Sequence, residues 1–260
     1  MRLALWWIFP VLPVLADAGL TTSLPKAELA PESNPPLQTI LEIENTARLL
    51  AVLLHSGRYV INENQDLLDD PEKGDKGFSP EVFEQQLLEM FRIRSGVDLR
   101  ELDPVRLPQE AKNLLLSLIA VSKQVVADAQ PDINRKGVGY KGFIPAVFGA
   151  RVASRFAAST GIGLKQTSLT PRNPSNAPDA FETAALQEFA DPAYPREKVI
   201  SEVTTKSRAL RLMFPLYATR RCLVCHGEPK GEQDKTGYPR EGLRLGQNAG
   251  AISVVIPLNR

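Results

Sequence analysis

Apolar residues recur every three or four positions from Leu37 to about Ile61, the spacing of a helix with one buried face. No Pro interrupts this stretch, and its first Gly is Gly57. We therefore expect one long helix near the start of the mature chain. Its predicted apolar face consists of Leu37, Ile40, Leu41, Ala47, Leu50, Ala51, Leu54 and Ile61.

Two further helices are expected after a polar break. Residues 66–78 are rich in acids, Gly and Pro, which end the first helix. Ser79 is then a typical N-cap residue and Pro80 suits a first helical turn, so we predict a second helix over about 79–94. A third helix is expected over about 108–129, where apolar residues again follow a helical period.

The second half of the chain favours strands. Residues 161–169 tend to alternate between apolar and polar, and 180–189 form a short helical pattern. A plausible hairpin connection lies at 206–208, between two of three β-leaning runs. These runs are 198–205, 209–218 and 249–258. Helices followed by grouped strands predict an α+β fold with an antiparallel sheet.

One eight-residue pattern, Lys-Gly-Phe-x-Pro-x-Val-Phe, occurs at 76–83 and again at 141–148. Each copy follows a polar turn that contains Gly and opens a predicted helix. A duplication and two merely similar helix starts both remain open at this point.

The first residues predict export. Arg2 precedes the apolar run 3–15, and the small-x-small pattern at 16–18 is typical of a signal peptidase site. An apolar run of this length, interrupted by two Pro, is shorter than the roughly 20 residues that cross a bilayer. We therefore interpret 1–18 as a cleaved signal peptide rather than a retained anchor, and the Pro- and Ser-rich residues 19–36 as a flexible tether. The mature chain is expected in the periplasm or otherwise outside the cytoplasm, without a stable membrane span.

Composition excludes several classes of protein. The 31 Lys and Arg nearly balance the 30 Asp and Glu, which argues against a nucleic-acid binder that uses a broad basic face. The chain contains only two Cys and two His. Two Cys cannot form a disulfide-dense scaffold, and by themselves they do not complete a structural zinc site.

Both Cys and one His form a single motif, Cys222-Leu223-Val224-Cys225-His226. The C-x-x-C-H spacing is typical of c-type haem attachment. Two thiols three residues apart can add to the two vinyl groups on one porphyrin edge, and the adjacent imidazole can bind the iron. A redox dithiol is an alternative, but the βαβ setting usual for it is not predicted here. We therefore predict one covalently bound haem c, with Cys222 and Cys225 as attachment points and His226 as an axial iron ligand.

The ligand on the other side of the iron is less constrained. His55 is the only other His, and it lies on the long first helix, so we favour His55 as the second axial ligand. Met213 and Met90 are alternatives that we interpret as core residues. An open site, a solvent ligand and a Lys ligand also remain open.

The loop 227–250 is rich in Gly and charge, as expected of a segment folded over a haem edge. Arg240 and Arg244 are candidates for contacts with the haem propionates, because a guanidinium pairs with a carboxylate through two hydrogen bonds. Solvated loop charges are the alternative interpretation of both residues.

Several segments together resemble a family of exported bacterial and cyanobacterial proteins that carry a single c-type haem on a PAS-like sensor fold, formerly a domain of unknown function. The resemblance covers about residues 37–258. The segments that carry it are 141–148, 165–168, 172–182 (with Arg-Asn-Pro-x-Asn), 211–216, 222–227 and 250–258.

The resemblance implies one domain over 37–260, a PAS-like antiparallel sheet with a long N-terminal helix, and haem held between helix and sheet. In the family the distal ligand can be a Cys from that helix. This chain has no third Cys, so His55 at that place would give two imidazole ligands. Residues 66–135 are longer than the family pattern, which suggests an extra helical segment inserted there. No output domain follows in the sequence, so we expect a stand-alone module.

These observations predict an exported c-type haem-binding protein that carries electrons or responds to redox state. The alternative is a sensor module that takes up a diatomic gas, or detects redox state, and signals to a partner protein. An enzyme, such as a peroxidase-like catalyst, is not favoured, because no distal acid–base pair is apparent beyond His55. The partner is expected to be a redox or signalling protein, not a nucleic acid.

Overall fold

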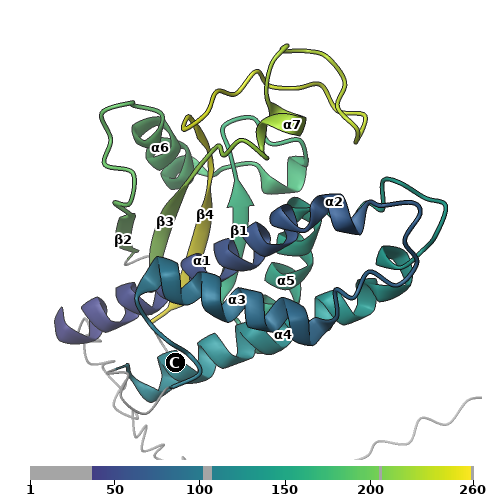
Figure 1. Ribbon diagram of the computed structural model, residues 1–260. Helices are drawn as coiled ribbons and strands as arrows, with labels where there is room; N and C mark the ends of the chain where they lie inside the picture. Colours follow the sequence, from purple (N-terminus) through teal and green to yellow (C-terminus); the bar gives the residue numbers. More distant parts are fainter. Residues whose placement is uncertain (1–36, 102–106, 205–206, 259–260) are drawn as a thin grey trace, which may run out of the picture. The chain divides into compact units, whose positions relative to one another are not determined.

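The computed structural model describes residues 37–101, 107–204 and 207–258. The predicted signal peptide and tether, residues 1–36, lie outside the described residues. The described part combines a long helix at its N-terminal end with a four-stranded antiparallel sheet (Figure 1). The α+β prediction is therefore confirmed. Among the described helices, none is both long and apolar enough to cross a membrane.

The sheet consists of β1 (Gly163–Thr167), β2 (Ile200–Thr204), β3 (Ala209–Tyr217) and β4 (Asn248–Pro257). Their order is β1-β4-β3-β2, and every neighbouring pair is antiparallel. Strands β2 and β3 pair antiparallel as the predicted hairpin requires, with Ile200 opposite Met213, while residue 206 of the predicted connection lies outside the described residues. Strand β4 comes last in the chain and lies between β1 and β3, so the long loop before it joins two neighbouring antiparallel strands at one end of the sheet.

The long helices lie on one side of this sheet, and the first and last of them make most of the contacts with its strands. They are α1 (Leu37–Glu63), α3 (Pro80–Ser95), α4 (Gln109–Ile133) and α5 (Pro145–Thr160), with one-turn α2 (Gln65–Leu68) following α1. Helix α1 packs against α3, α4, α5, β3 and β4, so it lies at the centre of the fold (Figure 1). Helices α3 and α4 occupy the segment for which an extra helical insertion is predicted.

A smaller cluster covers the opposite face of the sheet. Helix α6 (Ala180–Phe189) packs on β3 and β4, where Met213 is fully buried beside Leu186 and Phe189. The start of α6 is a capping box, because Asp179 accepts from the backbone N–H of Glu182 and the Glu182 carboxylate accepts from the N–H of Asp179.

The repeated sequence pattern has the same local structure in both copies. In each, the Lys ammonium donates to the carbonyl oxygens six and three residues earlier. The Gly then takes a positive φ, 64° at Gly77 and 73° at Gly142, which favours Gly over residues with a Cβ. Both Phe of each copy are buried, and Pro begins the helix, α3 or α5. The two copies therefore share their local structure as well as their amino-acid pattern.

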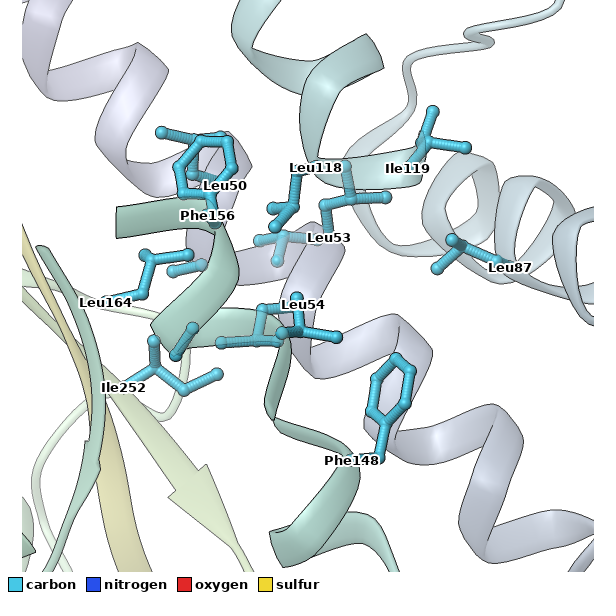
Figure 2. Close-up of a cluster of buried hydrophobic side chains, with 14 of the residues drawn as sticks. Leu50, Leu53, Leu54, Leu87, Leu118, Ile119, Phe148, Phe156, Leu164 and Ile252 are labelled. Atoms are coloured by element: carbon cyan, nitrogen blue, oxygen red, sulfur yellow. The ribbon is translucent and has the colours of Figure 1, made fainter. Parts of the chain in front are cut away.

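The final Phe of each copy meets the other over α1. The ring centroids of Phe83 and Phe148 are 5.3 Å apart, and both rings lie beside Gly57. A Cβ on Gly57 would be only 2.9 Å from Cε1 of Phe148, so the absence of a side chain lets α5 approach α1 closely. Figure 2 shows part of this core, including Phe148, Phe156 and residues of α1.

The helix predictions need two corrections. Leu37 and Leu41 were assigned to the apolar face of α1, yet they are 71% and 51% exposed, so that face begins further along the helix. Helix α4 also continues past the predicted end at 129 and through Pro131. Its last residue, Ile133, is fully buried, and this packing offsets the cost of a Pro in the helix.

Candidate functional site

One cavity brings together the residues of the C-x-x-C-H motif and the second His. Its volume is about 210 Å³, and its lining includes Cys222, Cys225, His226 and His55. His55 comes from α1 and the other three from α7 (Leu223–His226) and the residue before it, 167 positions or more away in sequence. Apolar lining residues include Leu216 near the end of β3, Ala249 near the start of β4, and Leu243 in the loop before β4.

The motif forms a single helical turn after β3. The N–H groups of Cys225 and His226 both donate to the carbonyl oxygen of Cys222, at 3.2 and 2.9 Å. This turn places both thiols and the imidazole on one cavity wall. Both Cys are free thiols, and burial, followed by the nearby Asp234 carboxylate, raises the pKa of Cys225. The hydroxyl of Thr219 lies 3.2 Å from Sγ of Cys222.

The imidazole of His226 is held by a carboxylate from the following loop. Its Nδ1 lies 2.8 Å from Oε2 of Glu241. With Nδ1–H donating to Glu241, the lone pair of Nε2 is free to bind a metal, which is the usual way an acidic partner orients a metal-binding His. Burial pushes the pKa of Glu241 up, but hydrogen bonds from Arg172 and His226 outweigh burial and lower that pKa. Glu241 therefore stays ionised as an acceptor.

Arg172 connects this carboxylate to the motif. Its guanidinium donates to both oxygens of Glu241, at 2.6 and 3.0 Å, and to the carbonyl oxygen of Cys225 at 2.9 Å. It also donates to the buried carboxylate of Asp234 at 2.7 Å and lies over the ring of Tyr238. One side chain therefore fixes the helical turn and two points of the loop that follows it.

Asp234 organises the tip of that loop. Its carboxylate accepts from the N–H groups of Thr236 and Tyr238 and from the hydroxyl of Thr236. Burial would raise the pKa of Asp234, but the hydrogen bonds from Thr236 and Arg172 lower it strongly. The site is thus built on a fully ionised, closely hydrogen-bonded network.

His55 lines the same cavity from α1. Its ring lies 6.0 Å from that of Phe214, centroid to centroid, at 50°. Burial, followed by the charges of Arg58 and Arg94, lowers the pKa of His55 well below its usual value, so the imidazole is neutral. Its Nδ1 is buried and has no hydrogen-bond partner within the described part of the chain. A neutral imidazole with spare bonding capacity suits metal binding.

Arg58, one turn after His55, also lines the cavity, and its Nε is buried without a partner among the described residues. Burial lowers the pKa of Arg58 to about 10, partly offset by the Cys222 thiol. Arg221 lines the cavity too, but it is paired with Glu63 and Asp66.

The two predicted propionate contacts do not line this cavity. Arg240 donates to the carbonyl oxygen of Glu228, and neither it nor Arg244 is among the residues that line this cavity. Arg244 is mostly exposed beside Glu228 and lines a second cavity. Met213 is in the core below α6, and Met90 packs against the main core, as interpreted from the sequence.

Sequence reasoning gave no role to Arg172, Glu241 or Arg58. Arg172 begins the Arg-Asn-Pro-x-Asn segment noted above, which was the available signal for it. Glu241 is one acid among several in a charged loop, and only the folded loop distinguishes it.

Comparison with known proteins identifies the family. Residues 37–257 match the model of the Tll0287-like family. The chain belongs to the Tll0287-like family. It is also similar to a solved structure described as the crystal structure of the cyanobacterial heme-protein Tll0287, with 21% identity, 58% of this chain and 96% of that chain covered, and a TM-score of 0.42. No curated protein matches. The family match spans all seven numbered α-helices and all four strands.

Proposed function

We propose that this Tll0287-like chain binds one haem covalently through Cys222 and Cys225, with His226 as an axial iron ligand, and that it transfers electrons or reports redox state outside the cytoplasm. The observation that carries the proposal is the shared cavity of the C-x-x-C-H motif and His55. The name of the similar solved protein, a heme-protein, supports the choice of cofactor.

The residues present fit a c-type haem. Both thiols are free, and the neighbouring imidazole has its Nδ1 occupied by Glu241, which leaves Nε2 for iron. His55 lines the same cavity, and its buried Nδ1 has no partner among the residues that the structure describes. A buried polar atom without a partner costs about 1–3 kcal/mol, and a bond from a cofactor to this nitrogen would remove that cost.

Ligation by His55 and His226 favours electron transfer over catalysis. A haem iron bound by two imidazoles supplies one-electron redox chemistry and has no free position for substrate. The chain's own part is to hold the two rings, exclude water with apolar lining such as Leu216 and Leu243, and fix the charge around the site. We propose export to the periplasm and a redox or signalling protein as partner, on the strength of the N-terminal sequence.

Arg58 favours a second candidate, a sensor of a diatomic gas. Arg58 lines the cavity one turn from His55, and its buried Nε–H has no protein acceptor in the described ranges. Such a donor could stabilise a polar ligand on the iron if His55 were displaced. On this reading, carbon monoxide should alter the spectrum of the reduced protein, and Arg58→Gln should weaken that binding.

The test is a set of absorption spectra on purified protein, oxidised and reduced, with and without carbon monoxide, together with haem staining after denaturing electrophoresis. We expect covalently retained haem and a six-coordinate spectrum that carbon monoxide does not change. His55→Ala should give a five-coordinate or solvent-ligated spectrum, while the control Met213→Leu should not differ from wild type. Haem lost on denaturation would refute covalent attachment, and an unaltered His55→Ala spectrum would refute His55 ligation.

A further inference from the structure

A second cavity adjoins the first at Tyr217. Its volume is about 540 Å³, and it lies between the end of α6 with the loop after it and the segment just before β4. Tyr217, the last residue of β3, lines both cavities. Leu243 and Ala249 face the first cavity, whereas Gly242 and Gly246 face the second, so one short segment forms part of both walls.

Two residues of the cavity lining carry hydroxyl groups without acceptors. The hydroxyl oxygens of Tyr194 and Tyr217 are both buried and have no partner in the part of the chain that the structure describes. Burial raises the pKa of both phenols, so both keep the proton that they can donate. Each buried hydroxyl left in this state costs about 1–3 kcal/mol unless a ligand or water bonds to it.

An exposed arginine in the lining adds a cationic donor. The guanidinium of Arg196 lies 5.1 Å above the ring of Tyr217, and within the described ranges it makes no hydrogen bond or ion pair. It fits there because Gly246 has no side chain: a Cβ on that residue would be 2.5 Å from Nη2 of Arg196. The positive φ of Gly246, 76°, also favours Gly at this position.

The acceptors of the cavity are largely engaged. Asp191 Oδ1 accepts from the N–H of Ala193, Gln247 Oε1 accepts from the N–H of Arg244, and the side chain of Asn248 bonds to Leu216 and Gly250. The charged side chains of the lining are Asp191, Arg196 and Arg244. A further carboxylate, Glu188, lies near Tyr194. The cavity therefore offers spare donors and cationic groups to a ligand that accepts hydrogen bonds.

We propose that this second cavity binds a carboxylate group, with the hydroxyls of Tyr194 and Tyr217 and the guanidinium of Arg196 as its donors. A carboxylate supplies two acceptor oxygens and one negative charge, which matches two hydroxyls and a guanidinium. The carboxylate belongs either to a small free organic acid or to a propionate of the haem in the adjoining cavity. The propionate source rests on the proposed function, whereas the free acid does not.

The experiment uses the full purified protein and benzoate as the probe for a free acid. Benzoate is titrated by calorimetry into wild type, Arg196→Gln, Tyr194→Phe and the control Arg135→Gln, whose guanidinium pairs with Asp132 on the distant end of α4. Resonance Raman spectra of the same four proteins then show the bending modes of the haem propionates, which change when the hydrogen bonds to a propionate change. Covalent haem is first checked on denaturing gels, so a failure of the proposed function is recorded separately.

Two outcomes support the proposal and separate its sources. Benzoate binding that weakens about tenfold or more in Arg196→Gln and Tyr194→Phe, but not in Arg135→Gln, assigns the cavity to a free acid, since a charge-assisted hydrogen bond is of that strength. No benzoate binding, with propionate modes shifted in the same two variants only, assigns it to the haem. If benzoate does not bind and the modes are alike in all four proteins, the donors are satisfied by water alone and the proposal is overturned.

Discussion

Nδ1 of His226 lies 2.8 Å from Oε2 of Glu241, so the motif His donates to an ionised carboxylate fifteen residues later. A carboxylate acceptor makes an imidazole a stronger electron donor to a bound metal. For a haem protein this favours the ferric state and lowers the reduction potential.

We therefore expect Glu241→Gln to raise the reduction potential of the haem. The amide is a weaker, uncharged acceptor, and a rise on the order of 60 mV would correspond to a tenfold change in the one-electron equilibrium. Spectroelectrochemical titration measures it. Glu232→Gln, an exposed acid in the same loop, is the control, and an equal shift in both variants would mean that only the loop's net charge matters.

Arg172 is expected to be the main support of the loop around residues 228–247. Lys in its place keeps the charge but cannot bond Glu241, Asp234 and the Cys225 carbonyl together. Because Asp234 is buried, Arg172→Lys should lower the free energy of unfolding by about 2–4 kcal/mol, below the full cost of breaking a buried pair since Arg172 is partly exposed. Urea denaturation measures this, with Arg135→Lys as control. This role would be contradicted if Arg172→Lys lost no more unfolding free energy than Arg135→Lys. It would also be contradicted if the loop of Arg172→Lys were cleaved by protease no faster than that of wild type.

Acid is expected to weaken the same network. The folded pKa of Asp234 lies below its unfolded value of about 3.9, so its stabilisation is complete above that pH and is lost as pH falls towards the folded pKa. Wild type should therefore lose stability more steeply than Asp234→Asn between about pH 5 and pH 3. Urea midpoints across this range decide the matter, and parallel curves for the two proteins would show that other carboxylates dominate.

Gly57→Ala should destabilise the protein although Ala is the better helix former. The added Cβ would be 2.9 Å from Phe148, and overpacking costs about 1–3 kcal/mol against a gain of up to about 1 from helix propensity. A net loss of about 1–2 kcal/mol is expected from thermal or urea unfolding. Gly74→Ala is the control, because a Cβ there meets nothing within 4 Å. Partial recovery in Gly57→Ala with Phe148→Leu would tie the effect to this contact.

Local pattern was sufficient to predict most elements, because helix α1, the start at Ser79 and the strands all depend on short-range period and capping. It was equally sufficient to find the C-x-x-C-H turn. It could not find Glu241 or Arg172, because their contacts join positions 15 to 69 residues apart through loops without a regular period. The exposed Leu37 and Leu41 show the other limit: an amphipathic pattern does not say how much of a helix its neighbours cover.

The two copies of the Lys-Gly-Phe pattern differ in what their helix starts face. In the second copy Ile144, Pro145 and Ala146 line the proposed haem cavity, whereas the matching positions of the first copy, residues 79–81, are absent from that lining. The same local structure thus lines the cavity in one copy and only supports the fold in the other. The first copy can therefore serve as a control for the second. A substitution that affects only folding should act alike in both copies, whereas one that changes the cofactor environment should do so only in the second copy.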